Sequence, residues 1–182
     1  MQHIKKEIML LRHGEAVAHS KDMTDYQRPL STTGITHCHQ LAQTLLEDKC
    51  LPQAIYSSPA MRTRQSCELL CEQWLMPLSG IHYDKGLYLG TMTHYLLYLT
   101  QLHNGYRRVM LTGHNPGLAD LASRLIGDET AVYPASLLIL SFQGHWQDLV
   151  TQRCELIQRY DPSLQGITEK TTISSCSYGS SN

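Results

Sequence analysis

Short apolar runs that alternate with longer amphipathic segments are the feature of this sequence that most restricts its fold. Runs of strand length lie at residues 8–11, 54–56, 108–112 and 137–140, and another is expected near residues 154–160. A continuous apolar run of this length is typical of a strand buried on both faces. Because helical segments separate the runs, we predict a three-layer α/β/α fold in which a mostly parallel central sheet carries helices on both faces.

The segment after residue 31 has the periodicity of an amphipathic helix, with Thr32 or Thr33 as its predicted N-cap. The polar stretch before it, residues 18–31, is interpreted as a loop. The inward face of the helix is expected to consist of Ile35, Cys38, Leu41, Ala42, Leu45 and Leu46.

Three further helices are predicted along the chain. The first of them has Pro59 in its first turn and ends before Pro77. The next covers residues 91–103, and the last follows Pro116 and is closed by Gly127 as a left-handed cap. The helix after Pro59 has an apolar stripe formed by Thr63, Cys67, Leu70, Cys71, Trp74 and Leu75.

Charge and cysteine usage exclude several classes of protein. Lys and Arg total 15 and Asp and Glu total 16, so no overall basic excess favours binding to nucleic acid or to a membrane. The longest apolar run is far shorter than the ~20 residues that cross a bilayer, and the first residues are not typical of a signal peptide. The 6 cysteines include no CxxC pair and are too sparse for a disulfide scaffold. We therefore expect a cytoplasmic protein.

The 182 residues are enough for one domain, which we place at residues 1–160. Residues 161–182 are rich in Ser, Thr and Gly and carry few large apolar side chains. Such a segment buries too little apolar surface to offset the entropy of ordering. We therefore expect it to be a flexible C-terminal tail.

Two histidines follow predicted strands at the point where each strand ends. His13 comes after the run at residues 8–11, and His114 comes after the run at residues 108–112. Arg12 precedes His13, and Arg62 opens the helix after the strand at residues 54–56. The carboxyl ends of parallel strands meet at one edge of a sheet, where ligands bind. Two Arg and two His at that edge predict a site for a tetrahedral anion, because Arg binds phosphate oxygens through paired donors.

The four positions lie in motifs that resemble those of the histidine phosphatase superfamily, and in particular phosphohistidine phosphatases of the SixA type. Leu-Arg-His-Gly-Glu at residues 11–15 is similar to the RHG signature, and Leu-Ser-Thr-Thr-Gly at residues 30–34 is similar to the segment that follows it. Residues 57–66 resemble the family's SPxxR segment, and Thr-Gly-His-Asn-Pro at residues 112–116 resembles its second-histidine motif. The resemblance implies the phosphoglycerate mutase-like α/β/α fold, in agreement with the periodicity.

The resemblance also implies a role for each residue. His13 matches the nucleophile, whose neutral imidazole attacks phosphorus and forms a phosphohistidine intermediate. Arg12 and Arg62 match the phosphate-binding arginines, and His114 matches the second histidine, which donates to the phosphoryl group. The positive charge of the flanking arginines is expected to lower the pKa of His13. No metal and no cofactor is implied, because the arginines supply the positive charge.

An acidic proton donor, which many members of the superfamily carry between the two halves of the motif set, has only one candidate here. Asp84 is the carboxylate of the segment at residues 83–89 and is predicted to lie in the loop before the third helix. Only 51 residues separate Arg62 from His114, which leaves no room for a large insertion. A substrate whose leaving group needs little help, such as phosphohistidine, suits a site without such a donor.

Other polar residues are interpreted as structural. Arg64 lies two positions after Arg62 and is expected at the rim or in solvent, and Glu15 is expected to orient the loop of His13. His37 and His39 are two apart on a helix and so face different sides, which argues against a metal pair. Inert core thiols are expected at Cys67 and Cys71, and Tyr83, Tyr88, Tyr95 and Tyr98 are expected in packing and in the wall of the pocket.

Three functions are compatible with these residues. The leading hypothesis is a metal-independent phosphatase that removes phosphate from a phosphorylated histidine of a partner protein, such as a phosphotransfer domain or a phosphocarrier. The second is a phosphatase of small phosphomonoesters or other phosphorylated metabolites. The third is a phosphate-binding module without turnover, against which the intact set of Arg12, His13, Arg62 and His114 argues.

Overall fold

A computed structural model, which describes residues 4–162, contains one sheet of six strands. The order of the strands across the sheet is β3-β2-β4-β1-β5-β6. The strands comprise β1 (Lys5–Arg12), β2 (Ala54–Ser57), β3 (Ile81–Tyr83), β4 (Arg108–Gly113), β5 (Leu137–Gln143) and β6 (Glu155–Tyr160).

The sheet is mostly parallel, as predicted. The strand β4 pairs in parallel with β1 on one side and with β2 on the other, and β3 extends the parallel part. The strand β5 runs antiparallel to β1, and β6 runs antiparallel to β5. Three strands at the centre of the sheet, β2, β4 and β1, therefore end at the same edge.

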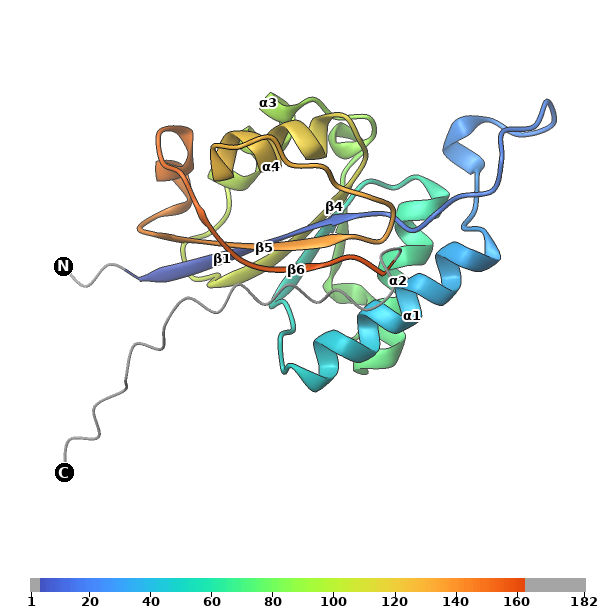
Figure 1. The fold of residues 1–182 in the computed structure, drawn as a ribbon, viewed down its shortest axis with the longest axis horizontal. Coiled ribbons are helices and arrows are strands. Elements are labelled where there is room, and N and C mark those ends of the chain that lie inside the picture. Colours follow the sequence, from blue (N-terminus) through green and yellow to red (C-terminus); the bar gives the residue numbers. More distant parts are fainter. Residues whose placement is uncertain (1–3, 163–182) are drawn as a thin grey trace.

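Four α-helices cover the two faces of the sheet in pairs, which confirms the three-layer α/β/α arrangement (Figure 1). One core joins the sheet to α3 and α4, and the other joins it to α1 and α2. The helices comprise α1 (Thr32–Glu47), α2 (Met61–Trp74), α3 (Met92–Thr100) and α4 (Gly117–Ile126). Short 3-10 helices lie in the connections: η1 (Asp25–Gln27), η2 (Leu78–Gly80), η3 (Lys85–Leu87) and η4 (Trp146–Val150).

The N-cap of α1 is Ser31, so the prediction of Thr32 or Thr33 as the cap was wrong. The Ser31 hydroxyl accepts a hydrogen bond from the Gly34 amide at 3.1 Å. Ser31 has extended backbone angles, as an N-cap residue does, whereas both threonines already belong to the helix. The predicted inward face was partly wrong: Ile35 and Leu46 at its two ends are exposed, and Cys38, Leu41, Ala42 and Leu45 are buried.

The helix α2 begins at Met61, so the prediction that Pro59 lies in its first turn was wrong. Ala60 is the N-cap, and the Thr63 hydroxyl donates to the carbonyls of Ser58 and Ala60. The predicted stripe is buried as far as Trp74. Leu75 is 91% exposed, because it adopts a left-handed conformation that ends the helix and turns its side chain outward.

The region between α2 and α4 contains one strand that the sequence pattern did not predict. The strand β3 has only three residues, too few to show a periodicity, and it is held by its parallel pairing with β2. The helix α3 is shorter than the predicted span of residues 91–103, because Thr91 caps its start and Gln101 ends it. Gly127 closes α4 in a left-handed conformation, as predicted.

The end of the described chain is packed against the domain. Asp161, which the sequence pattern assigns to the tail, is buried and accepts hydrogen bonds from Ser136 and Arg159. The remainder of the predicted tail, residues 163–182, lies outside the described residues. Within residues 4–162, no helix is long and apolar enough to cross a membrane.

Candidate active site

The candidate site is built from residues that directly follow the three central strands. His13 follows β1, Ser58 follows β2 and His114 follows β4. The register aligns the ends of these strands, because Arg12 pairs with Gly113 and Ser57 pairs with Thr112. The topology therefore brings the two histidines to one edge of the sheet, with ring centroids 5.0 Å apart.

His13 has a hydrogen-bonding pattern that assigns its tautomer. Its Nδ1 lies 2.7 Å from the Gly14 carbonyl oxygen, which can only accept, so Nδ1 carries the proton. Its Nε2 accepts a hydrogen bond from Arg62 Nε at 3.1 Å. The imidazole is therefore neutral, and the Nε2 lone pair is directed into the site, which is the form that a nucleophile requires.

His114 is assigned in the same way. Its Nδ1 lies 3.2 Å from Arg62 Nη2, and a guanidinium only donates, so Nδ1 is the acceptor and Nε2 carries the proton. The Nε2 group donates to the Ser58 hydroxyl oxygen at 2.9 Å. The backbone amide of His114 donates to the Tyr95 hydroxyl at 3.0 Å, and that hydroxyl donates to the Leu87 carbonyl. Both the ring and the backbone of His114 are therefore held in place.

Arg62 lies between the two histidines and is the centre of the site. Its side chain is only 5% exposed, and all of its nitrogen atoms have acceptors: Nε contacts His13, while Nη2 contacts His114 and Asp25. Its Nη1 donates to the backbone carbonyl of Asp25 at 2.6 Å. A buried guanidinium with this many contacts supplies a fixed positive charge at the edge of the sheet.

Asp25 is a site residue that the sequence analysis missed. One carboxylate oxygen accepts from Arg62 Nη2 at 2.9 Å and from the Tyr88 hydroxyl at 3.0 Å, and the other accepts from Arg28 Nη1 at 2.8 Å. Burial by itself would raise the pKa of Asp25, but these three hydrogen bonds outweigh it and lower the pKa to about 2. The only local signal in the sequence is the spacing of Asp25 and Arg28, three apart in a polar loop.

Arg12 lies beside this group without a hydrogen bond to it. Its Nη1 donates to the Val132 carbonyl at 2.9 Å, and its buried Nε has no partner among residues 4–162. Its positive charge acts on both histidines and lowers the pKa of each. The free Nε donor and the proximity to the histidines fit a residue that binds an anionic ligand.

Both histidines are held neutral at physiological pH. Burial lowers the pKa of His13 to about 4, and the charges of Arg62, Arg12 and Arg28 contribute after it, against a hydrogen bond to Gly14 that raises it. Burial also lowers the pKa of His114 to about 3, followed by the effects of His13 and Arg62. The expected influence of the arginines is thus present, although desolvation is the larger cause.

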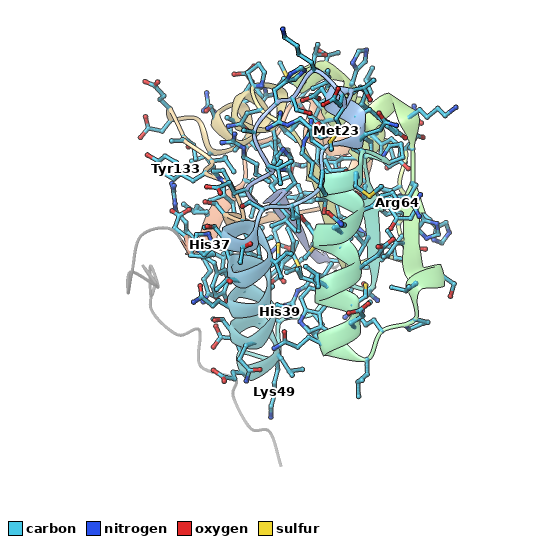
Figure 2. All side chains as sticks on the ribbon, turned by 90° about the vertical axis from the view of Figure 1, so that its right-hand side faces the viewer. Met23, His37, His39, Lys49, Arg64 and Tyr133 are labelled. Carbon is cyan, nitrogen blue, oxygen red and sulfur yellow. The ribbon has the colours of Figure 1, made fainter. Side chains whose placement is uncertain are left out.

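The structure gives the other sequence-predicted residues structural positions. Asp84 is the N-cap of η3, and its carboxylate accepts from the Gly86 amide at 2.7 Å. Glu15 links the His13 loop to the start of α1, because its carboxylate accepts from the Ser31 hydroxyl at 2.7 Å. Arg64 points away from α1 on the outer side of α2, where its guanidinium lies 4.7 Å from the centre of the Tyr83 ring (Figure 2).

His37 and His39 form no metal site. His39 faces α2, with its Nδ1 3.4 Å from Gln73 Oε1, and both histidines lie along α1 away from the described site (Figure 2). Within residues 4–162, no group of three or more His, Cys, Asp or Glu side chains is arranged to hold a metal ion. Burial raises the pKa of the Cys67 thiol to about 11 and that of Cys71 to about 12, in keeping with core thiols.

The fold is the α/β arrangement of phosphoglycerate mutase-like proteins, and the site places Arg12, His13, Arg62 and His114 at one edge of its sheet. Residues 8–87 match the sequence model of the histidine phosphatase superfamily (branch 1). This segment includes Arg12, His13, Asp25 and Arg62, and the resemblance inferred from the motifs is confirmed. The family match and the site support a phosphatase.

Similar proteins include one from Arabidopsis thaliana, the uncharacterized chloroplastic protein At3g52155, which is 28% identical over 155 residues, or 80% of this chain and 71% of the relative. A solved structure of the protein histidine phosphatase SixA with tungstate has a TM-score of 0.74 at 21% identity and covers 86% of this chain and 97% of its own. The mycobacterial glucosyl-3-phosphoglycerate phosphatase has a TM-score of 0.61 at 20% identity and covers 84% and 97%. At these identities the two structures show a shared fold.

Proposed function

We propose that this protein is a metal-independent phosphohistidine phosphatase that removes phosphate from a phosphorylated histidine of a partner protein. The observation that carries the proposal is the state of His13: its Nδ1 proton is held by the Gly14 carbonyl, and its Nε2 lone pair faces Arg62. An imidazole held neutral, correctly oriented and beside a fixed positive charge is a nucleophile directed at an anion.

The proposed reaction has two steps. In the first, His13 Nε2 attacks phosphorus, the bond from phosphorus to the leaving nitrogen breaks, and the phosphoryl group is carried on His13. In the second, water attacks this phosphoryl group, the bond from phosphorus to Nε2 breaks, and His13 recovers its lone pair, while the protons of the water leave with the phosphate. Arg62 and Arg12 are positioned to offset the charge on the phosphoryl oxygens in both steps. An oxygen of the phosphoryl group would take the place of the His13 lone pair as the acceptor for Arg62 Nε.

A second proton on His114 would make it a donor to the bound phosphoryl group. Its Nδ1 faces Arg62 Nη2 as an acceptor, and its Nε2 proton is already given to Ser58. A dianion in the site favours the charged form of a neighbouring imidazole and would raise the pKa of His114. His114 would then donate through Nδ1 while Ser58 keeps the ring in position.

The absence of a long segment between the two halves of the motif set supports a protein substrate. Only 51 residues separate Arg62 from His114, and they are taken up by the rest of α2, then η2, β3, η3, α3 and β4 with their connections. A short segment leaves no large insertion to cover the site. A phosphohistidine presented on the surface of a phosphotransfer domain or a phosphocarrier would need an uncovered site of this kind. The structural likeness to a protein histidine phosphatase supports the same substrate class. A cytoplasmic setting, without nucleic acid or membrane as a partner, remains part of the proposal.

Small phosphorylated metabolites are the second candidate class of substrate. The structural likeness to a glucosyl-3-phosphoglycerate phosphatase favours this alternative. The test is a comparison of kcat/KM for a phosphohistidine-containing phosphocarrier protein with kcat/KM for a panel of sugar and nucleotide phosphates. The proposal expects the phosphoprotein to be the better substrate by at least tenfold. Small esters that are preferred by orders of magnitude would overturn it.

Turnover is separated from simple binding of phosphate by trapping the intermediate. Wild-type protein quenched during the reaction is expected to carry an acid-labile, base-stable phosphate, and the variant His13→Ala is expected to carry none. The variant His37→Ala, which changes a histidine of α1 outside the site, is the control and should be labelled like the wild type. Phosphate binding without any labelled protein would favour the phosphate-binding module.

A further inference from the structure

The carboxylate of Asp25 contacts the end of the Arg62 guanidinium that points away from His13. Resting on the proposed function, we propose that Asp25 is a specificity-determining residue: its carboxylate accepts a hydrogen bond from the ring N–H of a leaving imidazole. It would thereby favour phosphoramidates over phosphate esters. The loop that carries Asp25 was interpreted from the sequence only as a polar connection between β1 and α1.

The contacts of Arg62 place Asp25 on the outward side of the site. The guanidinium presents Nε to the nucleophilic nitrogen of His13 and presents Nη1 and Nη2 to Asp25. His13 and Asp25 therefore lie at opposite ends of one planar group. In an in-line transfer the leaving group points away from the nucleophile, so it moves toward the end where Asp25 lies.

The position of the loop in the fold agrees with this assignment. The segment between β1 and α1, drawn in blue, projects beyond the end of the sheet at which the site lies (Figure 1). The Asp25 side chain is 37% exposed, whereas the Arg62 side chain is 5% exposed. Asp25 thus connects the buried part of the site with its surface, where a phosphohistidine on another protein would enter.

The Asp25 carboxylate retains capacity for one more donor. Two carboxylate oxygens offer about four acceptor positions. Arg62 and Tyr88 occupy one oxygen and Arg28 occupies one position on the other, and these are its partners among the described residues. An additional N–H group of a substrate is therefore accommodated without displacing Arg62.

The chemistry of phosphohistidine makes such an acceptor useful. One ring nitrogen is bonded to phosphorus, and the other ring nitrogen binds a proton to give a cationic ring. A neighbouring carboxylate favours that cationic form. When His13 Nε2 forms its bond to phosphorus, the electron pair of the breaking P–N bond returns to the ring, and neutral imidazole leaves with the N–H that Asp25 accepts. Protons and charge balance without a separate general acid.

A phosphate ester gains nothing from the same carboxylate. Its leaving oxygen departs as an anion or must receive a proton, and Asp25, with a pKa of about 2, holds no proton near neutral pH. Its negative charge also repels a developing oxyanion. Asp25 is therefore expected to discriminate between the two classes at the step in which the leaving group departs.

The test compares phosphoimidazole with phenyl phosphate in the wild type and in Asp25→Asn, with folding checked by circular dichroism. The substitution keeps the size of the side chain and removes its charge. We expect kcat/KM for phosphoimidazole to fall at least tenfold more than kcat/KM for phenyl phosphate. The control Asp22→Asn removes an exposed carboxylate of the same loop and should leave the ratio of the two values unchanged.

A structural role alone has a different signature. If Asp25 only positions Arg62, Asp25→Asn lowers both values by the same factor, and that result overturns the proposal. A second variant, Tyr88→Phe, removes one donor to Asp25 but leaves its charge, so it should retain the preference for phosphoimidazole. A wild-type protein that cleaves phenyl phosphate but not phosphoimidazole would also overturn it.

The two proposals fail in distinguishable ways. Because phosphoimidazole is a small molecule, the ratio tests Asp25 independently of any partner protein. A wild type that cleaves phosphoimidazole but no phosphohistidine protein contradicts the proposed protein substrate. The role of Asp25 is then still decided by the ratio of kcat/KM for phosphoimidazole to kcat/KM for phenyl phosphate. A protein substrate that is cleaved with an unchanged ratio in Asp25→Asn contradicts only the role of Asp25.

Discussion

Arg62 Nε donates a hydrogen bond to His13 Nε2 at 3.1 Å, so the nitrogen that is proposed to attack phosphorus rests against the residue proposed to bind it. This relationship holds the lone pair of His13 in one direction and also lowers its pKa. In the proposed reaction, a phosphoryl oxygen that takes over the Arg62 donor would free the lone pair when phosphorus is next to it. In the proposed reaction, binding of the phosphoryl group and activation of the nucleophile would thus be coupled through one guanidinium.

Replacement of Arg62 by alanine is predicted to lower kcat/KM by about 10²- to 10³-fold, which is the range for loss of a donor to a transition-state oxyanion. The reason is the loss of charge and of the donor on His13 at the same time. The measurement is steady-state kinetics on the phosphoprotein. The control is Arg64→Ala on the same helix, whose guanidinium packs on Tyr83, and it should change kcat/KM by less than about threefold. Equal losses in both variants would contradict the assignment.

Stability is predicted to fall as the pH is lowered from about 6.5 to about 4. An unfolded histidine binds a proton below pH about 6.5, whereas the folded site keeps His13 neutral down to about 4 and His114 down to about 3. The unfolded chain therefore binds more protons in this window, so acid favours it. Each histidine contributes a slope of about 1.4 kcal/mol per pH unit. Urea unfolding at pH 5, 6 and 7 measures how the free energy of unfolding depends on pH.

The variant His114→Gln isolates one of the two contributions to this slope. It should show a dependence on pH that is shallower than that of the wild type by about 1.4 kcal/mol per unit between pH 5 and pH 6. Identical slopes for the two proteins would show that His114 titrates normally in the folded state and would remove the argument for its neutral tautomer.

Substitution of Ser58 by alanine is predicted to reduce both stability and rate. The hydroxyl oxygen accepts from His114 Nε2 at 2.9 Å and from the Ala60 amide at 3.3 Å, and both donors are left unpaired when it is removed. The expected loss of unfolding free energy is about 1–3 kcal/mol, and kcat should fall roughly tenfold as the His114 ring loses its orientation. Ser58→Thr, which keeps the hydroxyl, should recover part of kcat. Alanine at this position with wild-type kcat would exclude an orienting role.

A side chain at Gly34 is predicted to disturb the His13 loop. A Cβ there would overlap the backbone carbonyl of Glu15, two residues after His13. We expect Gly34→Ala to lower the free energy of unfolding by about 1–3 kcal/mol, as overpacking does, and to lower kcat. Gly80→Ala is the matched control, because a Cβ there meets nothing within 4 Å, and it should be close to neutral. Denaturant unfolding and steady-state kinetics are measured on both variants. Equal losses in the two variants would show that the overlap with Glu15 is not the cause.

Most of the secondary structure could be predicted from the sequence, because the signals for strands and helices are local. Apolar runs of strand length and helical periodicity predicted five of the six strands and all four α-helices, whereas the three-residue β3 has no periodicity to detect. The ends of helices were less predictable. Ser31 rather than the adjacent threonines caps α1, because the choice depends on which residue has extended backbone angles.

The edge of the sheet on which the site lies was also accessible from the sequence. His13 and His114 follow strands, and parallel strands end together, so their convergence required no contact information. The placement of Arg62 at the start of a helix after a third strand follows the same argument. The positions of Arg12, His13, Arg62 and His114 were therefore predicted from order along the chain, while their roles remain proposals.

What the tertiary structure decided is everything that depends on contacts between distant parts of the chain. The tautomers of both histidines are set by which acceptors and donors meet them, and Asp25 reaches Arg62 from 37 residues away through a loop without periodicity. Asp84, the one carboxylate that the sequence offered as a candidate proton donor, is held as the cap of η3. Local patterns record which segments bury apolar surface, whereas the partner of a charged side chain is chosen only when the folded chain brings the two groups together.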